Sequence, residues 1–161
     1  MQHMEEIATK SLSAFFASYK KIAYKKREVI LRAEDRPQGV YFIKKGFVRF
    51  YDISKEGEEL TLLIFKQYDF FPVRWATTSL PIYYNYESLT PVEIARAPRE
   101  AFVTYLKTNP DVLFHITESI LVRLNNTFER MKYLVYGNAY AKVASILVIC
   151  TQRYGAIHEK G

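Results

Sequence analysis

The segment VYFIKKGFVRFYDISKEGEELTLLIF, residues 40–65, decides the fold of this chain. Its first part is rich in aromatic and β-branched residues and turns about Lys45 and Gly46, and the polar stretch SKEGEE then separates it from LTLLIF. Short β-prone runs divided by turn residues at close intervals are typical of an antiparallel roll or sandwich, whereas a parallel sheet alternates strands with helices. We therefore predict antiparallel β-structure.

The pattern on both sides of this segment adds further strands and two helices. The first 19 residues have apolar side chains at roughly helical spacing, namely Ile7, Leu12, Phe15, Phe16 and Tyr19. The runs EVILRA, YNYESL and VEIARA are β-prone and extend the sheet pattern. PREAFVTYL then begins a short helix, with Pro98 suited to its first turn.

A long helix follows with clear start and stop signals. The sequence TNPDV supplies a capping asparagine, a proline that needs no N–H partner and an aspartate at the positive end of the helix dipole. We expect this helix to cover residues 109–136, where Gly137-Asn138 interrupts it. A second helix then ends at Gly155.

The composition is that of a folded, basic protein. Of the 161 residues, 49% are hydrophobic and 16% are aromatic, and the net charge is +6. No run of about 18 apolar residues occurs and the start lacks a signal-peptide pattern, so we expect a cytoplasmic protein without a membrane span. The basic residues are densest in one run without an acid: Lys20, Lys21, Lys25, Lys26 and Arg27. This run suits either nucleic acid or a solvated face.

Neither a metal site nor catalysis is indicated. The three histidines lie far apart without ligand spacing: His3, His115 and His158. Three acidic residues form no evident acid-base pair: Glu87, Glu93 and Glu100. Ser79 has no nucleophile context, and the lone Cys150 sits in an apolar helical stretch that favours a buried structural thiol. We expect no cofactor and no enzyme activity.

Three segments follow one another in an order that is typical of one family: GVYFIKKGFVRFYDISKEGEELTLLIFKQYDFF, PVEIARAPREAFVTYLKTNPDV and AYAKVASILVICTQRYG. Together with the turn residues Gly46 and Gly57, they resemble the sensor half of a Crp/Fnr-family transcription regulator over about residues 15–155. The resemblance implies an α+β fold. Its centre is an antiparallel β-roll of the double-stranded β-helix, jelly-roll-like kind, flanked by an N-terminal helix and a long C-terminal dimerisation helix.

The resemblance also implies a division into three parts. Residues 1–108 would form the cyclic-nucleotide-binding-like sensor with its N-terminal helix, 109–136 the dimerisation helix, and 137–161 a helix leading to an absent DNA-binding domain. Family members continue into a winged helix-turn-helix that binds the major groove. This chain stops near Gly161, so we expect DNA binding only through a C-terminal domain that is not in this chain. We expect that this domain has been trimmed from a longer protein, and its natural absence is the alternative.

The positions that relatives use for cyclic nucleotides hold other residues here. Those relatives use a Gly-Glu pair, the backbone amides after it and an Arg-Ser pair, because a cyclic phosphate needs positive charge and free N–H groups. On this alignment Pro72-Val73 stands at the first pair and Ile82-Tyr83 at the second, and Tyr68 replaces a glycine ahead of Asp69. These replacements remove an N–H donor, the ribose acceptor and the cation. We therefore predict that cyclic AMP and cyclic GMP do not bind specifically.

Aromatic residues fill the same segment. Our candidates for contacts to an unknown small-molecule effector are Arg74, Trp75, Tyr83, Tyr84, Tyr86 and Thr127. Aromatic walls with a few polar groups are the usual lining for a flat or apolar ligand. The resemblance places Thr127 where relatives that bind cyclic AMP use a threonine, although Phe128 replaces the neighbouring serine. The alternative is that the rings only close the core of the roll and that Arg74 is solvated.

The long helix has two apolar stripes. The first stripe recurs at steps of three and four residues: Leu113, Ile116, Ile120, Leu124, Thr127, Met131 and Leu134. The second stripe repeats every seven residues: Phe114, Leu121, Phe128 and Val135. Together the two stripes form an apolar arc that is too wide for one partner. We therefore expect one stripe to pack on the roll of the same chain and the other to pack on a second chain. The resemblance assigns the first stripe to a homodimer.

These features favour the effector-sensing and dimerisation domain of a transcription regulator. In that case a signal on the roll would change the pitch of the paired long helices and so the placement of the DNA-binding domains. The rival hypothesis is a stand-alone degenerate roll that serves as a protein interaction module.

Overall fold

The computed structural model describes residues 2–155, with side chains for residues 7–151, 154 and 155. The side chain of His3, all of His158 and the end of the predicted third part lie outside the described residues. The chain divides into two compact units, one that ends at His115 and one that begins at Ile116.

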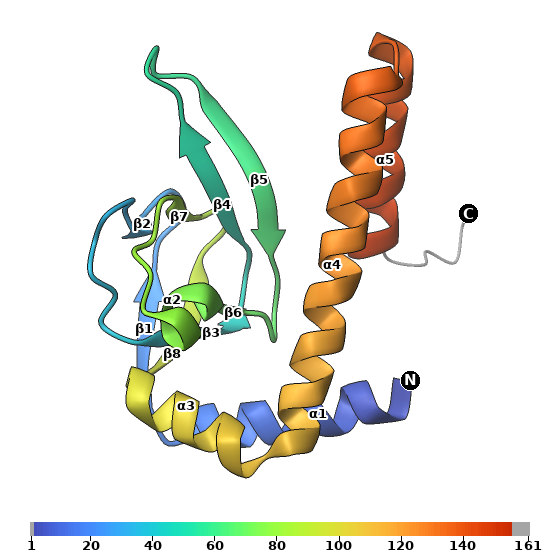
Figure 1. Ribbon diagram of the computed structural model, residues 1–161. Coiled ribbons are helices and arrows are strands. Elements are labelled where there is room, and N and C mark those ends of the chain that lie inside the picture. The colour runs from blue at the N-terminus through green and yellow to red at the C-terminus, as the bar shows by residue number, and fades with distance from the viewer. Residues whose placement is uncertain (1, 156–161) are drawn as a thin grey trace. The chain divides into compact units, whose positions relative to one another are not determined.

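The first unit contains the predicted β-roll (Figure 1). Its elements are, in chain order, α1 (Gln2–Ala17), β1 (Lys20–Tyr24), β2 (Val29–Leu31), β3 (Val40–Lys45), β4 (Val48–Ile53), β5 (Glu59–Phe65), β6 (Phe70–Phe71), α2 (Val73–Thr78), β7 (Asn85–Ser88), β8 (Val92–Ala97) and α3 (Arg99–Thr108). The strands form two four-stranded sheets with the orders β1-β8-β3-β6 and β2-β7-β4-β5, and every strand pair is antiparallel. The predicted α+β class with an antiparallel roll is therefore confirmed.

The turn at Gly46 moves the chain from one sheet to the other. Strand β3, which precedes Gly46, pairs with β6 and β8, whereas β4, which follows it, pairs with β5 and β7. Gly46 has a φ of 92°, and a Cβ at this position would lie 2.4 Å from the carbonyl oxygen of Pro91. Only glycine combines this φ with this close approach, because any other residue would carry a Cβ there.

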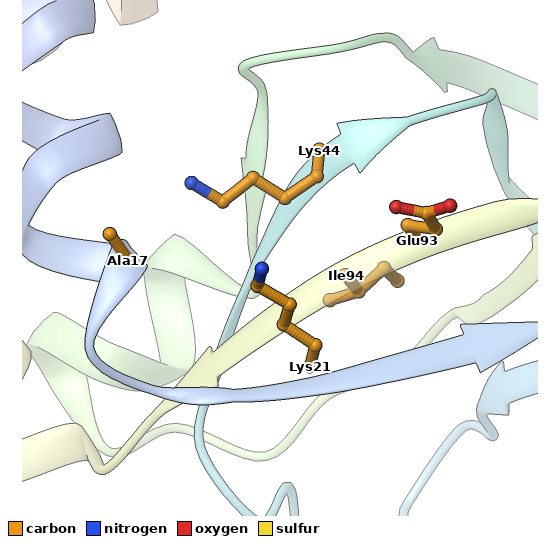
Figure 2. Close-up of a pocket in the computed structure, with 5 residues that line it drawn as sticks. All are labelled: Ala17, Lys21, Lys44, Glu93 and Ile94. Carbon is orange, nitrogen blue, oxygen red and sulfur yellow. The ribbon is translucent and has the colours of Figure 1, made fainter.

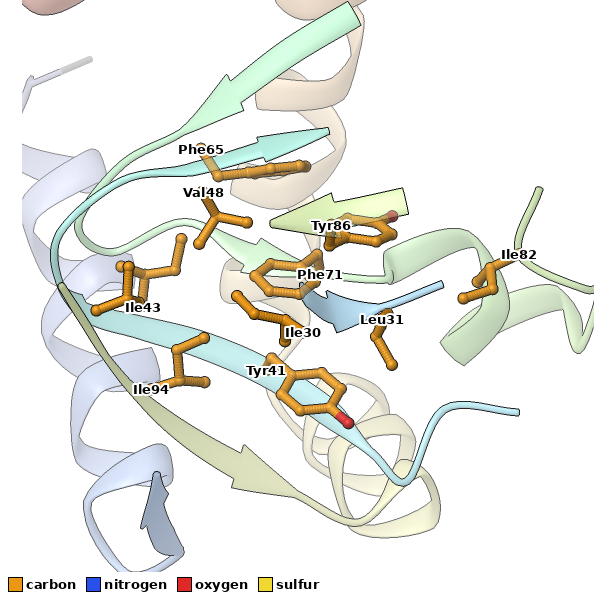
Figure 3. Close-up of a cluster of buried hydrophobic side chains, with 11 residues drawn as sticks. Ile30, Leu31, Tyr41, Ile43, Val48, Phe65, Phe71, Ile82, Tyr86 and Ile94 are labelled. Atoms are coloured by element: carbon orange, nitrogen blue, oxygen red, sulfur yellow. The ribbon is translucent and has the colours of Figure 1, made fainter. Parts of the chain in front are cut away.

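Side chains from both sheets meet in one hydrophobic core between them (Figure 3). The cluster comprises Ile30, Leu31, Tyr41, Ile43, Val48, Phe65, Phe71, Ile82, Tyr86, Val92 and Ile94. Alternate residues of a strand point to opposite faces, and the core accordingly takes Tyr41 and Ile43 from β3 and Val92 and Ile94 from β8. The roll is thus held together mainly by apolar burial.

Helices α1 and α3 pack on the outer face of the sheet that contains β3. The Phe16 ring of α1 stacks on Phe42 of β3 at a centroid distance of 4.8 Å, and it lies 5.9 Å from Phe102 of α3. All three rings are fully buried. A hydrogen bond of 2.6 Å between the Ser11 and Tyr105 hydroxyl groups joins the two helices directly.

The predicted helix boundaries in the C-terminal part are confirmed. Helix α4 (Pro110–Tyr136) contains the division between the two units, and α5 (Ala139–Tyr154) belongs to the second unit. The Asn138 side chain caps α5 by accepting a hydrogen bond of 2.9 Å from the Ala141 N–H, which satisfies one of the free donors at the helix start. The backbone N–H of Gly155 donates to the Thr151 carbonyl at 2.8 Å and ends the helix.

Candidate ligand site in the β-roll

The segment between β6 and β7 contains a short helix that the sequence does not predict. After β6, Pro72 precedes α2, and Ser79 ends this helix with a φ of 62°. Two of its six residues are threonines and one is valine, which have modest helix propensity, so the pattern is weak. The one local indication of a helix start is Pro72, immediately before the first helical residue, because proline is favoured where helices begin.

Contacts from outside the segment fix the end of α2. Arg99, at the start of α3, donates from Nε to the Ala76 carbonyl at 2.9 Å and from Nη2 to the Ser79 hydroxyl at 2.5 Å. Its guanidinium lies 5.8 Å from the Trp75 ring centroid. Arg99 is therefore part of the candidate site, although the sequence analysis does not single it out.

Aromatic side chains occupy the interior of the roll behind α2. Phe71 stacks on Tyr86 at 4.6 Å and on Tyr41 at 5.5 Å between centroids, and Phe50 lies 5.1 Å from Tyr86 and 4.8 Å from Tyr84. Phe71 and Tyr86 are both buried. Burial raises the pKa of the Tyr86 phenol far above its ordinary value, and the nearby positive charge of Arg74 opposes this only in part. The phenol is thus neutral and lies within the apolar core.

The two positions aligned with the Arg-Ser pair have separate environments. Ile82 is 4% exposed and belongs to the hydrophobic core, so an aliphatic side chain lies at the position that the sequence alignment predicts for the arginine. Tyr83 is 52% exposed and packs under Arg74, whose guanidinium lies 4.8 Å from the ring centroid. Arg74 also donates from Nη2 to the Pro81 carbonyl at 2.5 Å. Arg74 therefore contacts the loop that follows its own helix, α2.

Five of the six candidate residues belong to the stretch of the first unit from α2 to β7. Arg74 and Trp75 lie on α2, and Tyr83, Tyr84 and Tyr86 lie in the following loop and β7. Trp75 packs against the hydrophobic core, and Tyr84 is half-buried. Thr127 lies in the second unit, where its hydroxyl donates to the Arg123 carbonyl at 2.9 Å.

A charged cluster on the second sheet was not expected from the sequence. Arg49 of β4 contacts Glu87 through two hydrogen bonds of 3.2 and 3.1 Å and Glu59 through one of 2.6 Å, and its guanidinium lies 4.0 Å from the Tyr51 ring centroid. Burial alone would lower the pKa of Arg49, but the bonds to the two carboxylates outweigh burial and raise it. Glu87 therefore forms an ion pair with Arg49.

The first stripe of α4 is largely exposed in the single chain. Its exposed fractions run from 42% at Leu113 to 59% at Met131, and only Ile116 is buried. The second stripe is also exposed: Phe114, Leu121, Phe128 and Val135. Soluble monomers rarely expose apolar side chains so continuously along one element.

Cys150 does not have the predicted burial, because its side chain is exposed in the single chain. The half-buried residues of α5 include Ala141, Ser145 and Ile149, which recur every four residues. Cys150 lies one position beyond this stripe and therefore points away from it. Among the described side chains, no cluster of three or more histidine, cysteine, aspartate or glutamate residues could hold a metal ion. None of the described helices has the length and hydropathy needed to cross a membrane.

Two jelly-roll-like sheets, a short helix with its loop and a long following helix are the parts of a cyclic-nucleotide-binding-type domain. The sequence model of the cyclic nucleotide-binding domain family matches residues 21–109, and this chain belongs to that family. Its curated relatives are regulators of the Crp/Fnr family.

The curated relatives are global regulators by name. The global nitrogen regulator of Nostoc sp. is 25% identical over 134 residues, which cover 82% of this chain and 60% of the relative. The cAMP-activated global transcriptional regulator CRP of Pasteurella multocida is 24% identical over 126 residues, covering 78% of this chain and 60% of the relative. The chain thus spans less than two thirds of the length of these relatives.

Solved structures show the same fold. The c-di-GMP-responsive global regulator CLP of Xanthomonas campestris superposes with a TM-score of 0.78 at 19% identity, covering 93% of this chain and 75% of that chain. The catabolite activator protein of Thermus thermophilus has a TM-score of 0.66 at 17% identity, covering 78% of this chain and 59% of that chain.

Proposed function

We propose that the chain is the effector-sensing and dimerisation part of a Crp/Fnr-type transcription regulator and that its roll does not respond to cyclic AMP. The observation on which this depends is the position of Ile82 in the hydrophobic core. A cyclic phosphate at this point would lose its hydration without gaining a cation, and an uncompensated buried charge is strongly unfavourable. Arg74 does not replace the missing cation, because it is engaged with the Pro81 carbonyl and the Tyr83 ring.

The aromatic interior supports the same proposal. A purine or ribose in the roll would have to displace Phe71 or Tyr86, whose rings stack at 4.6 Å in the buried cluster. Protein interiors are close-packed, so inserting a ligand there costs the contacts that these rings already make. An effector of this roll would therefore differ in chemistry from a cyclic nucleotide.

Dimerisation is the second part of the proposal. The exposed first stripe of α4 offers a continuous apolar surface to a second copy of the chain. A twofold pair of such helices would bury this surface against itself, as in a two-stranded coiled coil. DNA recognition, if the whole protein resembles its relatives, would belong to a further domain beyond this chain.

Isothermal titration calorimetry with cyclic AMP and cyclic GMP tests the sensing part of the proposal. We expect no saturable heat up to about 1 mM nucleotide, a limit that corresponds to a binding free energy of about −4 kcal/mol. The CRP of Pasteurella multocida, titrated in the same buffer, is the positive control. Micromolar affinity that disappears in Arg74→Ala would contradict the proposal, because Arg74 would then supply the cation.

A further inference from the structure

A pocket of about 290 Å³ lies outside the roll interior, on the sheet face next to the end of α1 (Figure 2). Its lining residues are Ala17, Lys21, Lys44, Glu93 and Ile94, which come from α1, β1, β3 and β8. These residues come from three separate segments of the chain, and the antiparallel pairing of β1 and β3 with β8 brings the segments together. The volume is near the lower end of that of small-molecule sites.

Lys44 is the most enclosed charge in this pocket. Its ammonium donates to the carbonyl oxygen and the hydroxyl of Ser13 at 3.2 and 3.3 Å, and it lies 5.0 Å from the Phe42 ring centroid. Burial lowers the pKa of Lys44 and the positive charge of Lys21 lowers it further. The protonated state of Lys44 would therefore gain from an anion close to it.

Lys21 supplies a second ammonium to the same space. It lies on β1 opposite Ala95 of β8, and Ala95 is in turn opposite Phe42 of β3, so all three residues belong to the same face of the sheet. In Figure 2 the Nζ atoms of Lys21 and Lys44 lie towards the α1 end of the pocket, and the Glu93 carboxylate lies at the other end. The pocket therefore has a positive end with two cations and a negative end with one carboxylate.

We propose that this pocket binds the phosphate or carboxylate group of a small metabolite between Lys21 and Lys44. An oxyanion placed there accepts charge-assisted hydrogen bonds from both ammonium groups and removes the repulsion between them. The Glu93 carboxylate repels a second anionic group, so the pocket selects a molecule with a single anionic end over a polyanion. This site is separate from the roll interior, and it does not depend on the proposed absence of a response to cyclic AMP.

Backbone amide NMR titration of the full chain with inorganic phosphate, and separately with acetate, tests the proposal at constant ionic strength and pH 7. We expect saturable shifts at the amides of residues 21, 44 and 95. The anion that binds more tightly tells a phosphate-bearing metabolite from a carboxylate-bearing one. Pyrophosphate should bind more weakly than phosphate because of Glu93.

Three variants that each remove one positive charge distinguish binding in the pocket from a general effect of net charge on anion binding. Lys44→Met and Lys21→Met should each weaken binding by roughly tenfold or more, whereas Lys26→Met, outside the pocket, should leave the dissociation constant unchanged. If Lys44→Met fails to fold, Lys21→Met alone tests the site. Lys21 is exposed on an edge strand, so its substitution should leave the fold intact. Absence of saturation with both anions, or equal weakening by Lys26→Met, would overturn the proposal.

Discussion

Replacing Leu124 with glutamate should dissociate the proposed dimer. Leu124 lies near the middle of the first stripe and is 46% exposed in the single chain. Near a twofold axis the same position on both helices faces the same interface, so one substitution introduces two carboxylates. Neither would have a partner in the apolar stripe.

The size of the effect follows from burial and charge. Full burial of a leucine side chain contributes about 1.5–3 kcal/mol, so burying the exposed half in each copy contributes about 1 kcal/mol, or about 2 kcal/mol for a dimer. Two unpaired, desolvated carboxylates cost several kcal/mol more. A total of about 5 kcal/mol would raise the dissociation constant by more than about a thousandfold.

Sedimentation velocity of both proteins at low micromolar concentration is the assay. We expect a dimeric parent, a monomeric Leu124→Glu variant with unchanged helical circular dichroism, and a dimeric Asn126→Glu control. Asn126 is exposed and lies on neither stripe, so this control adds the same charge to another side of α4. A monomeric parent, or a Leu124→Glu variant that is still dimeric, would refute the assignment of the first stripe.

Three further substitutions test the packing and electrostatics of the roll. Phe71→Ala removes a ring that is 1% exposed and should lower the free energy of unfolding by about 3–5 kcal/mol in urea titration; a loss below about 1 kcal/mol would show that the interior tolerates an empty volume. Tyr86→Phe tests the raised pKa of this phenol. An unfolded tyrosine ionises near pH 10 whereas the folded one stays neutral, so stability should fall above pH 10. The variant should make that fall shallower by up to about 1.4 kcal/mol per pH unit, measured by thermal melts, and an unchanged slope would contradict burial of the phenol. Arg49→Met leaves the half-buried Glu87 without its bidentate partner and should lower the free energy of unfolding by about 2 kcal/mol. Glu59→Gln, at the more exposed partner, should lower it less. Equal losses for the two variants would mean that the Arg49–Glu59 pair, and not the Arg49–Glu87 pair, supplies the stability.

Most of the strands and the long helices are predictable from the sequence because their boundaries depend on local chemistry, whereas the sequence pattern does not predict β1 and β6. Gly46 marks the turn between β3 and β4, and Gly137-Asn138 marks the break between α4 and α5. Each of these residues acts on its own backbone or within one helical turn. A pattern over neighbouring positions is therefore sufficient to find them.

The missed features depend on contacts between residues that are distant in sequence. Arg49 and Glu87 are 38 positions apart and become partners only through the pairing of β4 with β7. Helix α2 is short and has weak propensity, and Arg99, which fixes its end, is 23 positions from Ala76. Strand register and helix docking create these contacts, and neither can be derived from a local pattern.

The contacts of the loop after α2 restrict how an effector could act on this roll. Phe71, Tyr86 and Ile82 are buried in one core, so a ligand that used them would first have to break their packing. The loop after α2 also has an exposed polar contact at its start, where Arg99 donates to the Ser79 hydroxyl. Such contacts exchange readily with a ligand, because exposed charged groups lose little when they change partners. A change at the Arg99–Ser79 contact would therefore cost least, because it would release the end of α2 while the core stays intact.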